Sequence, residues 1–254
     1  MAQYLKQKPW LLAVAVWAGS LSTSAMALTL PTTFVKADSV FELSDLAVDA
    51  LSAAGSTISP LGNSFSVASS TQAFDLPVTK VDVSLGLFPP SITPVSGDAT
   101  GSALLISRGS RNLALANFHI DFNAQTVNAD VITGGATTKG VSIYDFDVAS
   151  PLKIGLSGLT LNMTEKLNHL VLTSDALSIF ASALNLNRVL QAPLKTLDFG
   201  TINIDIKGAL RIPAVSDKPF TVDNLPAVPE PSTWALLALG LVGVATIARR
   251  RQVK

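Results

Sequence analysis

Residues 113–131 read LALANFHIDFNAQTVNADV, and this stretch decides the fold class. From Phe118 the apolar residues alternate with polar ones, and the alternation resumes from Val127 to Val131 after the polar run at residues 123–126. Alternation with a period of two indicates a strand with one buried face and one wet face. Two such runs joined by a short polar loop predict a β-hairpin.

The alternation changes phase inside this stretch. Apolar residues occupy odd positions at Leu113 and Leu115, and even positions from Phe118 onward. Because one extra residue in a strand restores the inward face, we predict a β-bulge at residues 116–117. A similar change between residues 143 and 146 predicts a second irregularity, and Gly134-Gly135 predicts the turn that precedes that strand.

Further alternating runs at residues 81–87 and 202–206 extend the β pattern in both directions. At residues 39–54 and 174–186 the apolar positions instead recur at spacings of three and four, which predicts two helices. We therefore expect one mainly β domain over residues 28–216, a β-sandwich or β-roll with two helical segments covering an open end. A jelly roll or a barrel fits the same pattern.

Composition narrows the classes of function. The chain has 254 residues, no cysteine and two histidines, which excludes a disulfide framework, a thiol nucleophile, a thiolate zinc site and a multi-histidine metal centre. Residues 28–228 carry 12 basic and 17 acidic side chains, a formal charge of −5. The basic residues are scattered singly, so we expect no nucleic-acid partner.

The first 27 residues have the organisation of a secretory signal peptide. Two lysines precede an apolar run at residues 10–18, and small residues follow, with Ala25 and Ala27 in a small-x-small cleavage site. The run is too short to cross about 30 Å of hydrocarbon, which argues against an N-terminal anchor. We expect export by the Sec translocon and cleavage by signal peptidase after Ala27.

The C-terminal region has three parts. The tripeptide Pro229-Glu230-Pro231 comes first, residues 232–248 carry no charge, and Arg249, Arg250 and Arg251 follow. An uncharged run of this length predicts a short transmembrane helix, and the arginines predict a stop-transfer block on the cytoplasmic side. Residues 217–228 contain Pro219 and Pro226 and are expected to be a linker between the body and the membrane.

These C-terminal residues resemble the PEP-CTERM sorting domain. The run Val-Pro-Glu-Pro-Ser-Thr, an apolar helix with Gly240 and Gly243, and a terminal arginine cluster occur in the family's order over residues 228–254. The family belongs to Gram-negative bacteria that make extracellular polysaccharide. The resemblance implies recognition by an exosortase, cleavage at or near the Pro-Glu-Pro motif, and transfer of the body to the outer envelope or matrix.

Candidate chemistry inside the body is sparse. His119 and His169 have no partners nearby in sequence, and we expect both to face solvent on strands. Asp145 and Asp147 share one strand face and are weak candidates for calcium ligands, the only cofactor that the sequence suggests. More widely spaced carboxylates, such as Asp121 and Asp130, leave a glycosidase pair as an alternative.

The combined expectation is a non-enzymatic exported protein that passes through the inner membrane and then resides in the outer envelope or extracellular matrix. There we expect a structural or adhesive role linked to exopolysaccharide, as in a biofilm. The alternatives are a carbohydrate- or calcium-binding module and a secreted hydrolase. All three tryptophans lie in the terminal segments, which weakens the case for a sugar-stacking face on the body.

Overall fold

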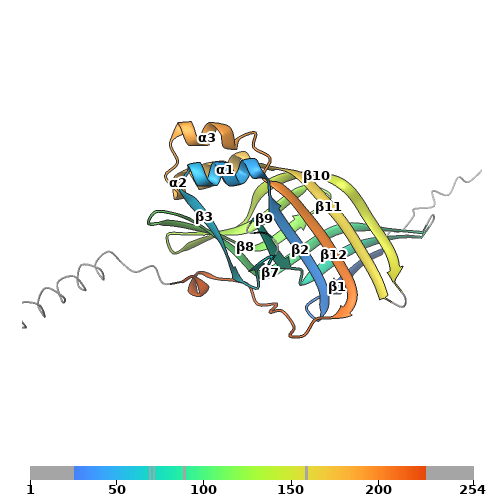
Figure 1. Cartoon of the computed structure of the whole chain (residues 1–254). Helices are drawn as coiled ribbons and strands as arrows, with labels where there is room; N and C mark the ends of the chain where they lie inside the picture. The colour runs from blue at the N-terminus through green and yellow to red at the C-terminus, as the bar shows by residue number, and fades with distance from the viewer. Residues whose placement is uncertain (1–25, 69, 71, 88–89, 158–159, 227–254) are drawn as a thin grey trace, which may run out of the picture.

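The computed structural model describes residues 26–226, apart from residues 69, 71, 88–89 and 158–159. In this part of the chain one antiparallel sheet curls into a half-barrel, and the helices gather on one side of it (Figure 1). The strands are β1 (Met26–Pro31), β2 (Val35–Leu43), β3 (Ser56–Gly62), β4 (Phe65–Ser66), β5 (Ala73–Pro77), β6 (Lys80–Leu87), β7 (Pro90–Arg108), β8 (Arg111–Asp121), β9 (Thr126–Thr133), β10 (Ala136–Ser157), β11 (Thr160–Leu172) and β12 (Gly200–Leu210). The helices are α1 (Asp45–Ala53), α2 (Ser174–Ala183), α3 (Arg188–Leu194) and the 3₁₀ turn η1 (Val222–Asn224).

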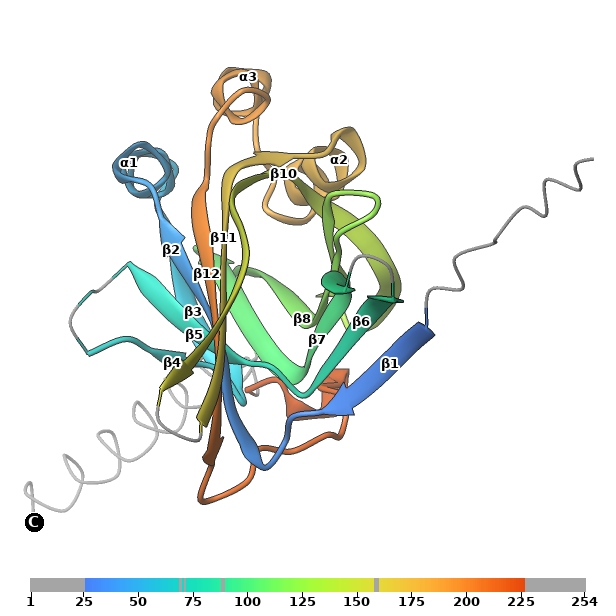
Figure 2. The same ribbon diagram turned by 90° about the vertical axis from the view of Figure 1, so that its right-hand side faces the viewer.

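The sheet order is β1-β6-β7-β8-β9-β10-β11-β12-β2-β5-β4, with β3 added to β7. Strands β6 to β12 therefore form a meander in which sequence neighbours pair. The chain between β5 and β6 bridges β2, which pairs with the last meander strand β12, and β7 near the other end of the meander. Val78 N donates to Ala37 O on β2 and Thr79 N donates to Asp98 O on β7, both at 2.8 Å. This link explains the strong curvature seen end-on (Figure 2).

The mainly β prediction is confirmed, but the described strands form one curled sheet rather than the two sheets of a sandwich. The predicted hairpin is β8 and β9, and the turn at Gly134-Gly135 joins β9 to β10. The predicted bulge is also present, since the β8–β9 register shifts between Ala116 and His119 and Asn117 has a φ of 52°. Strand β10 has register shifts on both sides, including one between Ser142 and Tyr144.

The helix predicted at residues 39–54 is wrong in its first part. Residues up to Leu43 belong to β2, which pairs with β12. In this strand buried Phe41 and Leu43 alternate with more exposed residues. The helix begins only after Ser44, whose side chain caps it by accepting a hydrogen bond from Ala47 N. The helix predicted at residues 174–186 is confirmed as α2. Helix α3 was not predicted, because it has only seven residues, contains Pro193 and shows just one pair of leucines at helical spacing, Leu190 and Leu194.

The main core lies inside the half-barrel. Inner side chains of the sheet pack there against α1 and α2, which cover one end of the interior. Phe41, Tyr144 and Phe199 meet at this end, with ring centroids 6.0 Å apart for the first two and 5.3 Å for the last two. A second apolar cluster, which includes Val83, Met163 and Ile206, continues the interior toward the opposite end.

Residues 211–226, here named the C-terminal strap, lie against the outer side of the sheet. Val215 N donates to Thr33 O, and Phe220 is only 6% exposed among Ala103, Ala116 and other side chains of β7, β8 and β9. The predicted linker at residues 217–228 thus contains three residues that pack on the body, Phe220, Val222 and Leu225. The expected signal peptide at residues 1–27, apart from its last two residues, and the expected membrane helix at residues 232–248 lie outside the described residues.

Candidate functional site

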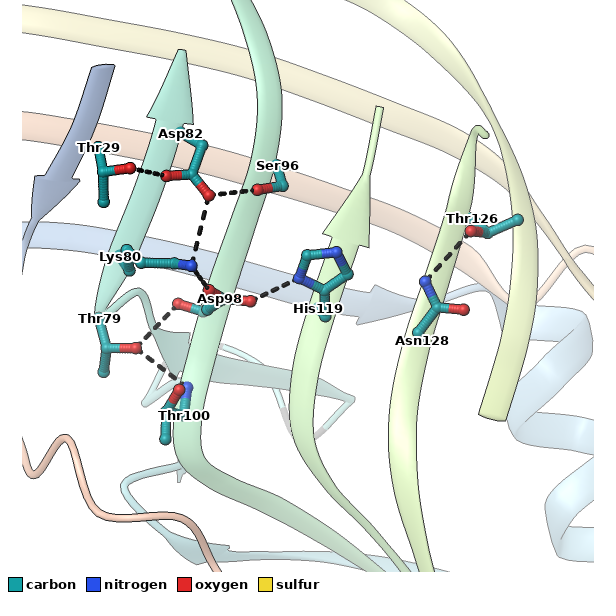
Figure 3. Close-up of polar contacts among 10 residues, drawn as sticks. All are labelled: Thr29, Thr79, Lys80, Asp82, Ser96, Asp98, Thr100, His119, Thr126 and Asn128. Carbon is teal, nitrogen blue, oxygen red and sulfur yellow. Dashed lines mark hydrogen bonds and ion pairs between the residues drawn. The ribbon is translucent and has the colours of Figure 1, made fainter. Parts of the chain in front are cut away.

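A row of polar side chains crosses the outer face of the sheet (Figure 3). Lys80 on β6, Asp98 on β7, His119 on β8 and Asn128 on β9 are direct cross-strand neighbours. Beside them, Thr29 on β1, Asp82 on β6 and Ser96 on β7 form a second row. Alternation places these polar residues outward because Val81, Val83, Phe118 and Ile120 occupy the inner face.

Lys80, Asp82, Asp98 and His119 form what we name the charged ladder. Lys80 Nζ lies 2.9 Å from Asp98 Oδ2 and 3.3 Å from Asp82 Oδ2, and His119 Nδ1 lies 2.5 Å from Asp98 Oδ1. Hydroxyls of Thr29 and Ser96 donate to the two oxygens of Asp82. The ladder therefore holds its exposed side chains in fixed positions on the sheet.

The same contacts set the electrostatics of the ladder. The hydroxyl donors Thr29 and Ser96 lower the pKa of Asp82, because they stabilise its ionised form. The hydrogen bond to Asp98 raises the pKa of Lys80, with a further contribution from Asp82. Lys80 and Asp82 are therefore both charged at neutral pH. The side chains of Lys80 and His119 remain 43% and 40% exposed, so both present polar atoms to solvent.

The interior of the half-barrel contains a second site. A cavity of about 60 Å³ is lined mainly by apolar inner side chains of the strands, and Glu165 is the acidic side chain of β11 that contributes to its wall. Glu165 is 6% exposed, and burial raises its pKa to about 7. Burial is the sole cause, so no described charge or hydrogen-bond donor offsets the cost of ionising this carboxyl.

A third group of charges lies on the outer side of β2, β5 and β12. Arg211 of the strap pairs with Asp38, and Asp205 lies directly across from Asp38 on the neighbouring strand. Asp75 on β5 is 9% exposed, and burial followed by the nearby charge of Asp38 raises its pKa to about 7. This group attaches the start of the strap to β2.

The predicted histidines lie on different strands. His119 is on the outer face, as expected, but it has a partner that sequence reasoning missed, since Asp98 is 21 residues away along the chain. His169 is exposed on β11, with a φ of 55°, and stands apart from the ladder. Polar residues alternate with apolar ones in both strands, which indicates that Asp98 and His119 face solvent. Pairing the two residues also requires the register of β7 and β8 across their bulges, which the sequence does not show.

The carboxylates singled out in the sequence do not come together as a site. Asp145 and Asp147 are both exposed, with buried Phe146 between them. Asp121 accepts two backbone hydrogen bonds in the β8–β9 turn, and Asp130 accepts from Asn117 Nδ2 and Gly140 N. Within the described residues, no group of three or more histidine, aspartate or glutamate side chains is arranged to hold a metal ion.

Asn117 links the bulge to the strap. Its Oδ1 accepts from Gly101 N and from Phe220 N at 2.7 Å, while its Nδ2 donates to Asp130 Oδ2 and to Phe220 O, both at 2.9 Å. The strap then continues to Leu225 and Pro226, which line an outer pocket with Ser110 and the Gly134-Gly135 turn. Pro226, at the end of the described residues, therefore lies beside the β7–β8 and β9–β10 turns.

The predicted sorting residues Pro229, Glu230, Pro231 and Arg249 to Arg251 lie outside the described residues, as does Ala25, whereas Ala27 is in β1. Residues 227–252 match the PEP-CTERM protein-sorting motif. The chain carries a PEP-CTERM sorting motif. This motif implies export, an exosortase as the processing partner, and membrane-anchored sorting to the cell envelope. Among the described residues, no helix is long and apolar enough to cross a membrane.

No curated protein matches the chain. Among solved structures, the heme-binding protein HtaB from Corynebacterium glutamicum aligns with a TM-score of 0.43 and 10% identity, over 73% of this chain and 98% of that one. The C-terminal domain of HtaA from the same organism aligns with a TM-score of 0.39 and 13% identity, over 68% of this chain and 98% of that one. At these scores and identities, nothing about the ligand of this chain follows from either alignment.

Proposed function

We propose that this chain is an exosortase-processed protein of the outer envelope or extracellular matrix, with a non-enzymatic structural or adhesive role linked to exopolysaccharide. The observation that carries the proposal is the PEP-CTERM motif at residues 227–252, which begins directly after the last packed residues of the strap. Sorting acts on whatever is attached to the motif, so the folded half-barrel is the cargo that reaches the outside.

The charged ladder supports the adhesive part of the proposal. Its carboxylate oxygens are engaged by Thr29, Ser96, Lys80 and His119, so they are committed to holding the ladder together rather than to acid–base chemistry. Lys80 and His119 remain partly exposed on a sheet face with fixed geometry. Groups that are already ordered lose little entropy when they bind the hydroxyl and acidic groups of a polysaccharide.

Processing is tested by replacing Pro229, Glu230 and Pro231 with alanine in the native host. We expect wild-type protein to be recovered outside the inner membrane, with a mass that corresponds to a chain from Leu28 to near Pro229. The triple variant should retain the C-terminal region and stay in the inner-membrane fraction. The measurement is intact mass together with cell fractionation.

The matched control replaces Asp217 and Pro219 with alanine. Both residues are exposed, and their replacement removes an acid and a proline just upstream of the motif. This control should be sorted like wild type. Unchanged mass and destination in the triple variant would contradict the exosortase proposal.

The adhesive role is tested with polysaccharide purified from the native host. Replacing Lys80 with alanine and His119 with asparagine should lower retention of the protein on this polysaccharide roughly fivefold, which corresponds to about 1 kcal/mol of lost hydrogen bonding. His169→Asn is the control, because His169 is exposed away from the ladder and asparagine tolerates its positive φ. Equal retention of all variants would rule out the ladder as the adhesive surface.

A further inference from the structure

The inner face of the half-barrel is apolar from its helical end to the opposite end. Phe41 and Tyr144 line the cavity at the helical end, and Val83, Leu152 and Met163 line it at the other. The walls continue beyond the cavity along two long hairpins, β6–β7 and β10–β11, which extend away from the helices (Figure 1).

The interior is not closed at that far end. Ile92 pairs with Leu85 and Ile154 pairs with Met163, so both isoleucines share the inner face of their strands. They are nevertheless 39% and 43% exposed, unlike Met163 one strand away, which is 7% exposed. The half-barrel is therefore an apolar cup, with the helices at its base and Ile92 and Ile154 at its mouth.

Glu165 lies in the wall of this cup between Met163 and Leu167, and all three side chains point inward. Its cross-strand neighbour is Ile204, and the next strand carries buried Ser39 opposite the same isoleucine. An ionised carboxylate in such surroundings is costly unless a donor or cation pairs with it. The lining is mainly apolar and contains two acids: Asp98, whose carboxylate pairs with Lys80 and His119, and Glu165, for which the described residues provide no charge or donor.

The size of the cavity limits what can enter. A cavity of about 150 Å³ is enough for benzene, whereas the free space here is about 60 Å³. A ring or a whole alkyl chain would need the inner side chains to move, whereas the first few carbons next to an amine fit without movement and the rest of a single chain can lie along the open mouth. Because the carboxyl of Glu165 pairs best with a positive charge, it favours an alkyl chain whose head group is a protonated amine.

We propose that the apolar cup binds a single-chain alkyl amine, with the amine paired to Glu165 and the alkyl chain against the inner faces of the strands. This site is separate from the sorting motif and from the charged ladder. Binding there would add a small-molecule function to the exported body.

The test uses the full-length chain in lipid nanodiscs and dodecylamine that carries a photoreactive diazirine at the end of its chain. Labelled peptides are mapped by mass spectrometry, which separates cup labelling from partition into lipid. We expect labels on inner-face peptides of β10, β11 and β12. Unlabelled dodecylamine should compete about tenfold better than dodecanol, as expected for a charge-assisted hydrogen bond, and dodecanoate should compete least.

Glu165→Gln is the diagnostic variant, because it keeps the size of the side chain and removes its charge. It should lose the tenfold preference for the amine over the alcohol. Asp75→Asn is the control, because Asp75 is an equally buried acid that does not line the cavity, and it should behave like wild type. Circular dichroism establishes that both variants are folded.

Three results would overturn the proposal. One is labelling confined to outer-face peptides, and another is equal competition by the three head groups. The third is an unchanged amine preference in folded Glu165→Gln. Each outcome is independent of sorting, because the nanodisc experiment does not involve an exosortase.

Discussion

At the scale of single residues, two buried acids control how stability depends on pH. Burial raises the pKa of Glu165 from 4.5 to about 7, and burial together with Asp38 raises that of Asp75 from 3.8 to about 7. Between these limits the folded state binds more protons than the unfolded chain, so the free energy of unfolding falls as pH rises. The full stability is present below about pH 4 and the loss is complete above about pH 7.

Glu165→Gln should therefore flatten the pH profile between about pH 4.5 and 7. Its share of the loss is about 3.5 kcal/mol, because a rise in pKa from 4.5 to about 7 corresponds to about 1.4 kcal/mol for each pKa unit. Urea denaturation at a series of pH values measures the effect. Asp75→Asn should remove its own share, and the double variant should keep only the dependence caused by Asp38, whose pKa burial also raises. A Glu165→Gln profile parallel to wild type would show that the carboxyl ionises freely in the folded state.

The sequence contained a signal for Glu165 that a pattern search can use. In residues 161–167 the odd positions, which face inward, are Leu, Met, Glu and Leu. One acid therefore stands at a position where the alternation predicts an apolar residue. The partnership of Asn117 with Phe220 had no such signal, because the two residues are 103 positions apart. The bulge itself was predictable from the change of phase, but the use of its asparagine to hold the strap depends on tertiary structure.

At the scale of elements, the strands with clean alternation were predictable and the boundaries were not. The spacing Val40, Leu43, Leu46 suits a helix, whereas Phe41 and Leu43 suit a strand, and the two patterns overlap. Pairing with β12 and β5 decides for the strand up to Leu43. Ser44 then marks the change, since its side chain donates to Asp198 O and caps α1.

The packing of the strap was not predictable from the sequence, because its prolines and scattered apolar residues suggest a linker. We expect Phe220→Ala to release it, since this ring fills the outer apolar cluster and removing a buried aromatic side chain costs about 3 to 5 kcal/mol. The strap makes few contacts with the half-barrel, so it can detach while the half-barrel stays folded. Only part of this free energy is therefore lost from the stability of the half-barrel. Limited proteolysis should therefore show faster cutting within residues 211–226, with a smaller shift of the overall melting temperature.

Lys218→Ala is the control for the strap, because Lys218 is exposed two residues before Phe220 and is not part of the outer apolar cluster. It should be cut at the wild-type rate. Proteolysis of the Phe220→Ala strap at that same rate would mean that the hydrogen bonds of Asn117 hold the strap without the ring.

At the scale of the whole molecule, the end of the strap and the mouth of the cup lie toward opposite ends of β7. Leu225 and Pro226 pack beside Ser110 at one end of β7, whereas the mouth residue Ile92 is near the other end. Strand β7 has 19 residues, which at about 3.3 Å per residue gives a length of about 60 Å. Residues 227–231 can span at most about 20 Å. If the motif anchors the chain in a membrane, we therefore expect the β7–β8 turn to lie near the membrane and the mouth, at the other end of β7, to lie farther from it.

Because the chain has no cysteine, this orientation can be measured with single labelled positions. In full-length protein held in nanodiscs, a fluorophore on Ser110→Cys should be quenched by spin-labelled lipid headgroups, and one on Ile92→Cys should not. Inserting 20 glycine and serine residues after Pro226 lengthens the tether by about 25 Å on average, so the difference should shrink. Equal quenching at the two positions with the native tether would mean that the strap detaches when the chain is anchored. In that case the cup would open toward the membrane as often as away from it.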